Sequence, residues 1–122
     1  MCFNISLQLK KTRMEQRYNA VYPEDIDFKP IYHASAFERP QLPLITNLQP
    51  NRFELMNWGL IPSWVKTEVE AKEISTKTMN ARAESITHKP SFKQSAKTNR
   101  CIIPITGFFE WQQIDSKKNP GL

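Results

Sequence analysis

Glycine and histidine are scarce in this chain, and their scarcity excludes several classes of function. Among 122 residues there are three glycines and two histidines. The glycines, at positions 59, 107 and 121, are too scattered to form a phosphate-binding loop or a dinucleotide-binding motif. His33 and His88 lie far apart, and the sequence has neither a CxxC nor an HExxH motif. We therefore predict no nucleotide cofactor and no bound metal ion.

Cysteine and long apolar runs are also rare. Cys2 and Cys101 are too few for a disulfide framework, which favours a reducing, cytoplasmic compartment. No stretch approaches the run of about 20 apolar residues that a membrane-spanning helix needs. The N-terminal segment MCFNISLQLKK lacks the pattern of a secretory signal. The length fits one domain. Since DSKKNPGL resembles a hairpin tip without its second strand, we expect residues 1–122 to form a single, incomplete domain.

Positive charge predominates. Seventeen lysine and arginine residues against twelve aspartate and glutamate residues give a net charge of +5. Such an excess favours polyanions such as nucleic acids, because each neutralised phosphate releases condensed counterions. Lys89, Lys93, Lys97 and Arg100 recur at helical spacing, which indicates one basic helix face. That face is either simply solvated or follows a phosphate backbone, and the spacing fits both.

Capping boxes and apolar spacing predict the helices. Thr12 with Glu15, followed by apolar residues at helical spacing, predicts an amphipathic helix over residues 12–22. A second capping box, Thr67–Glu70, opens a helix that runs towards residue 76. We expect a tight, partly helical segment at NARAESI and a further short helix that begins at Pro90.

The strand signals are strongest near the C-terminus. Short extended pieces are expected at residues 31–32 and 44–46, and a strand at about 52–58. The run RCIIPITGFFEW is rich in β-branched and aromatic residues and is predicted to continue as strand through Ile114. Alternation would place Phe108 and Glu110 on one face and Trp111 on the other. Cys101 lies in the apolar part and is expected to be a buried, inert thiol.

Four short motifs occur in a characteristic order along the chain. They are Cys2 directly after the initiator methionine, WGLIPSW at 58–64, NARAES at 80–85 and RCIIPITGFFEW at 100–111. Each is weak alone, but together they resemble the SRAP family, the SOS-response-associated peptidases that act as abasic-site processing proteins. The resemblance covers residues 1–115 and corresponds to the N-terminal part of the family domain.

This resemblance implies a fold and an activity. The implied fold is a compact α+β domain in which bifurcated mixed or antiparallel sheets form a small barrel flanked by short helices. The implied partner is single-stranded DNA that contains an abasic site. Family members trap that site covalently through the N-terminal cysteine, in lyase-like chemistry that shields the lesion. The peptidase name implies that the protein also removes its own leading residue.

The chemistry of an N-terminal cysteine agrees with that role. Methionine is normally removed when the next side chain is small, which would leave Cys2 as the first residue. Its α-amine has an ordinary pKa of about 7.7–8.0, so an appreciable fraction is unprotonated near pH 7. The amine can form a Schiff base with the open aldehyde of an abasic sugar, and the thiol can then close a thiazolidine ring. An internal cysteine has no such amine.

Three residues in the motifs match functional positions of the family. Glu110 matches the catalytic glutamate, whose carboxyl can shuttle protons; otherwise it is a solvent-facing carboxylate on a strand. Asn80 matches the asparagine that positions the abasic sugar, with a helix N-cap as the alternative role. Arg82 matches a DNA-contacting arginine, with a structural salt bridge as the alternative.

Aromatic and basic residues supply the remaining DNA-contact candidates. The three tryptophans can stack on exposed bases or pack in the core. We assign Trp58 and Trp111 to the core and Trp64 to DNA. Lys93 and Lys97, on the basic helix face, are further candidates for DNA contacts.

The chain departs from the family pattern in three places. The family often begins Met-Cys-Gly-Arg with the arginine on DNA, whereas this chain has Phe3 and Asn4, and Asn4 is retained as a DNA-binding candidate. His33 replaces the asparagine usual after the family's tyrosine, with unknown effect. The family's catalytic histidine lies in an H-x-R-M-P-like segment downstream of the glutamate, and neither His33 nor His88 matches it.

Two alternatives to a crosslinking enzyme stay open. The chain could be a basic fragment that binds single-stranded DNA without covalent chemistry, in which case binding depends on salt and no species survives denaturation. A general cysteine hydrolase is the other alternative, and it would need a histidine near Cys2.

Overall fold

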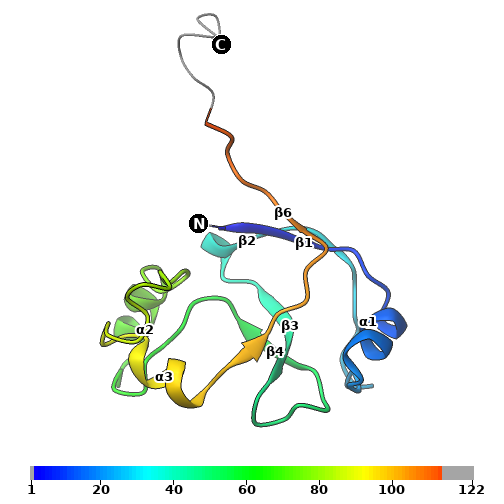
Figure 1. Ribbon diagram of the computed structural model, residues 1–122, viewed down its shortest axis with the longest axis horizontal. Helices are drawn as coiled ribbons and strands as arrows, with labels where there is room; N and C mark the ends of the chain where they lie inside the picture. Colours follow the sequence, from blue (N-terminus) through cyan, green and yellow to red (C-terminus); the bar gives the residue numbers. More distant parts are fainter. Residues whose placement is uncertain (1, 114–122) are drawn as a thin grey trace, which may run out of the picture.

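The computed structural model describes residues 2–113, which form two small antiparallel sheets and several short helices (Figure 1). In chain order the elements are β1 (Asn4–Leu7), α1 (Lys11–Tyr18), β2 (Ile31–Ser35), the 3-10 helix η1 (Ala36–Glu38), β3 (Gln41–Thr46), β4 (Glu54–Asn57), α2 (Glu68–Ser75), α3 (Lys93–Thr98), β5 (Cys101–Ile102) and β6 (Gly107–Phe108). The predicted α+β class is confirmed. In the part of the chain described, no helix is long and apolar enough to cross a membrane.

The chain passes between the two sheets through η1, after β2, and again near the end of the described residues. One sheet has the order β2-β1-β6 and the other β4-β3-β5. Residues 101–108 therefore leave the edge of the second sheet, pass through the buried Pro104 and join the edge of the first. Figure 1 shows α1 on one side of the sheets and α2 with α3 on the other. Within residues 2–113 the two sheets stay separate and do not close into the expected small barrel.

The hydrophobic core consists of two clusters. The larger one includes the fully buried Phe53, Met14 and Leu7, with Tyr22 packed against Phe53 at a ring-centroid distance of 5.6 Å. The smaller one contains Ile5 and its neighbours beneath the sheet β2-β1-β6. Apolar side chains from β1 contribute to both clusters, so the first strand joins the two halves of the core.

Helix α1 is shorter than predicted and begins without the expected cap. Asn19 adopts a left-handed conformation with φ 48° and ends the helix. The residue at the N-cap position is Lys10, and it makes no side-chain capping bond. The carboxylate of Glu15 instead accepts the backbone N–H of Tyr22, with an N···O distance of 3.3 Å. The capping box predicted at Thr12 is therefore wrong, because its glutamate stabilises the chain after the helix.

Helix α2 begins as predicted. Thr67 is the N-cap residue, and its hydroxyl oxygen accepts the backbone N–H of Glu70 at 3.2 Å. The other end of α2 packs closely on the backbone of Gly59, whose φ is +106°. A Cβ at Gly59 would lie 2.9 Å from the carbonyl oxygen of Ser75, so both conformation and space require glycine there.

The C-terminal run is the least accurately predicted part. Only residues 101–102 and 107–108 of it are strand, and the predicted continuation to Ile114 lies partly outside the described residues, as does the predicted hairpin tip at 115–122. Cys101 is exposed rather than buried, because β5 is an edge strand with two residues. Neighbouring atoms still desolvate its thiol enough to raise the pKa of Cys101 above the ordinary value. Trp111, assigned to the core, is 98% exposed, because β6 ends at Phe108.

Candidate functional site

Cys2 lies two residues before β1, half-buried against the smaller core cluster. Its thiol donates a hydrogen bond to the backbone carbonyl of Asn4, with an Sγ···O distance of 3.2 Å. The segment after Cys2 is held in the sheet, since Asn4 pairs with Ser35 and Ile5 with Ala34. Cys2 is thus attached to a paired strand, unlike the frayed end that most chains have.

Asn80 is directly bonded to the N-terminal cysteine. Its side-chain Nδ2 donates to the backbone carbonyl of Cys2 at 2.8 Å, across 78 positions of sequence. The residue before it, Met79, is fixed in turn because its carbonyl accepts the indole N–H of Trp58 at 2.8 Å. NARAES therefore contacts Cys2, and WGLIPSW contacts the residue directly before NARAES.

The GFFEW motif reaches the same place through the backbone of Asn4. The carbonyl oxygen of Asn4 accepts both the thiol of Cys2 and the backbone N–H of Phe109, the latter at 2.9 Å. Glu110 is the next residue, and it lines a cavity of about 390 Å³ together with Asn4, His33, Phe109 and Trp111. Hydrogen bonds thus link Asn80 to Cys2, and Cys2 and Phe109 to the carbonyl of Asn4, and Glu110 directly follows Phe109 in the chain.

His33 is the residue of this site to which the sequence assigned no role. Its Nε2 lies 2.9 Å from Oδ1 of Asn4, and since Oδ1 can only accept, Nε2 carries the proton. The imidazole also packs edge-on against the ring of Phe109, with centroids 5.5 Å apart and an interplanar angle of 74°. Because His33 and Asn4 are 29 positions apart, only the strand pairing reveals that they touch.

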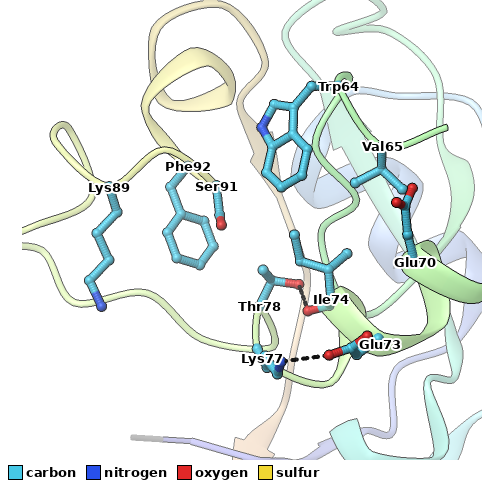
Figure 2. A pocket seen from close by; sticks show the side chains of 10 residues that line it. All are labelled: Trp64, Val65, Glu70, Glu73, Ile74, Lys77, Thr78, Lys89, Ser91 and Phe92. Carbon is cyan, nitrogen blue, oxygen red and sulfur yellow. Dashed lines mark hydrogen bonds and ion pairs between the residues drawn. The ribbon is translucent and has the colours of Figure 1, made fainter.

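A second, larger cavity contains Trp64. It has a volume of about 440 Å³ and lies between α2 and the segment that leads into α3. Figure 2 shows the indole of Trp64, the ring of Phe92 and the side chain of Ile74 converging on it. Trp64 is 56% exposed, so an aromatic face remains open to a ligand. Lys77 in the cavity wall pairs with Glu73 at 3.0 Å (Figure 2).

Comparison with known proteins decides the family. The SRAP family profile, described as SOS response associated peptidase, matches residues 1–121. This chain belongs to the SRAP family. The predicted resemblance is thereby confirmed over almost the whole sequence.

Curated SRAP relatives are named for abasic sites. The abasic site processing protein YoaM of Bacillus subtilis is 41% identical over 91 residues, a match that covers 75% of this chain and 38% of YoaM. The abasic site processing protein HMCES of Xenopus tropicalis is 42% identical over 66 residues, which are 53% of this chain and 19% of HMCES. The chain therefore spans well under half of the length of these relatives.

A solved structure supports the fold. The crystal structure of a protein from Bacteroides thetaiotaomicron superposes with a TM-score of 0.81 at 39% identity, covering 93% of this chain and 50% of that one. The arrangement of strands and helices that brings Cys2 to Asn80 is therefore shared with an experimentally determined relative.

The other residues singled out in the sequence lie in several parts of the fold. Trp58 is half-buried and packs against the smaller core cluster, as predicted. Arg82 is exposed, and its carbonyl accepts the N–H groups of Ser85 and Ile86 in the helical turn expected at NARAESI. Lys93 and Lys97 are exposed on α3, where a contact with DNA stays a prediction. Among residues 2–113 no group of three or more potential metal ligands occurs.

Proposed function

We propose that this chain processes abasic sites in single-stranded DNA and links to them covalently through Cys2 once Met1 has been removed. The proposal is supported by the names of the SRAP relatives and, above all, by the 2.8 Å bond between Asn80 and the carbonyl of Cys2. That bond holds Cys2 beside the NARAES motif, 78 positions away in the sequence. Such an arrangement suits an N-terminus with a chemical task.

The proposed reaction needs no oxidant or reductant. The α-amine of Cys2 attacks the sugar aldehyde, and loss of one water gives a Schiff base. The thiol of Cys2 then adds to the carbon of the C=N bond, and its proton ends on the nitrogen. The product is a five-membered thiazolidine ring that contains both nucleophiles of the residue. The α-amine is suited to this attack because its ordinary pKa lies near neutrality.

The neighbouring residues take distinct parts in this proposal. Glu110 lines the cavity beside Asn4 and would move protons during sugar ring opening and dehydration. Asn80 would position the N-terminal residue and the sugar. An exposed Trp64 would stack on a base, while Asn4, Arg82, Lys93 and Lys97 would contact the DNA backbone or bases. The family name further suggests that the chain removes its own leading residue.

A denaturing gel tests the proposal directly. Purified chain with a free Cys2 is incubated with a single-stranded oligonucleotide that carries one abasic site. We expect a slower band that survives denaturation, and its loss in Cys2→Ser and in protein whose α-amine is acetylated. Cys101→Ser is the matched control and should crosslink normally. If both blocked proteins still form the band, the mechanism is wrong. Salt-sensitive binding without any covalent band would instead support the non-enzymatic DNA-binding alternative.

A further inference from the structure

His33 and Asn4 form a polar pair on one face of the sheet β2-β1-β6. Asn4 pairs with Ser35 across the two strands, so His33 lies two residues along on the same face. Phe109 follows β6 on the opposite side of Asn4 and donates its N–H to the carbonyl of Asn4 at 2.9 Å. Three neighbouring chain segments therefore place His33, Asn4 and Phe109 side by side, with the cavity of Glu110 next to them.

The hydrogen bond from His33 determines which way the amide of Asn4 faces. Oδ1 of Asn4 accepts the Nε2–H of His33 at 2.9 Å. The other end of the same planar amide, Nδ2, is consequently directed away from the imidazole. Because Asn4 lines the cavity with Glu110, its two N–H bonds are available to donate to an oxygen atom of a bound sugar or phosphate.

Asn4 of this pair also contacts Cys2, which lies just before β1. The backbone carbonyl of Asn4 accepts the thiol of Cys2 at 3.2 Å and the N–H of Phe109 at 2.9 Å. His33 contacts this unit twice, through the side chain of Asn4 and through the ring of Phe109. A displacement of Asn4 would therefore move the thiol and the residue before Glu110 together.

We propose that His33 is a positioning residue for the covalent step, holding the Asn4 amide and, through it, Cys2 and Glu110 in a reactive arrangement. This inference rests on the proposed function. His33 acts in it through hydrogen bonding and ring packing and takes no part in bond formation.

The test compares crosslinking rates at saturating and at limiting abasic oligonucleotide. His33→Phe keeps a ring against Phe109 but removes the donor to Asn4, whereas His33→Gln retains an N–H donor. We expect His33→Phe to lower the maximal crosslinking rate by about tenfold, the effect of one lost hydrogen bond in the reactive state. The oligonucleotide concentration at half-maximal rate should change by less than about threefold. His33→Gln should restore the rate to within about twofold of the wild-type value.

Two controls separate positioning from a general loss of structure. His88→Phe alters the other histidine, which bonds to Thr87 at 3.1 Å, and should leave the rate unchanged. A double-mutant cycle of His33→Phe with Asn4→Ala, read by urea unfolding without DNA, should be non-additive if the pair is coupled.

The outcomes distinguish this inference from the proposed function. A wild-type rate in His33→Phe, an equal loss in His33→Gln, or full additivity in the cycle would overturn the role of His33 alone. A wild-type chain that forms no covalent adduct would overturn the proposed function and this inference with it.

Discussion

Replacing Asn80 with alanine removes the contact that joins the N-terminal residue to the rest of the site. The lost bond runs from Nδ2 of Asn80 to the carbonyl of Cys2 at 2.8 Å and is partly buried. A hydrogen bond of this kind contributes about 0.5–1.5 kcal/mol net to the state in which it forms. Since about 1.4 kcal/mol is a factor of ten, we expect the crosslinking rate at saturating DNA to fall about two- to tenfold.

Asn57 offers a matched control. Its Nδ2 donates to the carbonyl of Arg39 at 3.0 Å, so Asn57→Ala removes the same kind of bond between a side chain and the backbone, away from Cys2. Both variants should lose about 1 kcal/mol or less of unfolding free energy in urea. Only Asn80→Ala should lose crosslinking rate, measured by quenched time points on a denaturing gel. A wild-type rate in Asn80→Ala, or an equal loss in Asn57→Ala, would refute the reasoning.

Three further predictions concern stability. Thr67→Ala should lower the unfolding free energy by about 1 kcal/mol, because the α2 cap is lost. Thr12→Ala should change the unfolding free energy by less than about 0.5 kcal/mol. Equal effects of the two variants in urea melts would contradict the observed caps. Phe53→Ala removes a fully buried ring and should lower the unfolding free energy by about 3–5 kcal/mol. Thermal circular dichroism should show a lower unfolding midpoint, and a shift of about one degree or less would contradict this core. Gly59→Ala should destabilise by at least about 1 kcal/mol, because the new Cβ would meet the backbone of Ser75, and an unchanged midpoint would contradict that packing.

The sequence predicted those elements whose signals are local. Thr67 and Glu70 belong to one helix turn, so the capping box alone determines the start of α2. The identical spacing at Thr12 and Glu15 failed because Tyr22 competes for the carboxylate from beyond the helix. A capping box read from sequence cannot exclude such a competitor, since it depends on how the chain turns after the helix.

Residues whose environment depends on strand pairing were predicted less well. Trp111 was assigned to the core on the expectation that the strand continues past it, but β6 ends at Phe108. Cys101 lies in an apolar run and is nevertheless exposed, because its strand is at a sheet edge. The contact between His33 and Asn4 could not be predicted from the sequence, because it depends on the register of β1 and β2.

The structure joins parts of the chain that the motifs placed far apart. Asn80 bonds to the carbonyl of Cys2, and Phe109, the residue before Glu110, bonds to the carbonyl of Asn4. The order of the motifs predicted this proximity, because proteins that share a fold keep such residues at defined places in it. The catalytic roles of Cys2, Asn80 and Glu110 stay predictions. Composition and charge indicated only a preference for polyanions.

The most direct test of the central claim is tandem mass spectrometry of the product formed with an abasic oligonucleotide. The account predicts an adduct whose mass equals protein plus oligonucleotide minus one water, located on an N-terminal Cys2 whose thiol no longer reacts with iodoacetamide. An adduct on a lysine, or one in which the Cys2 thiol can still be alkylated, would contradict it.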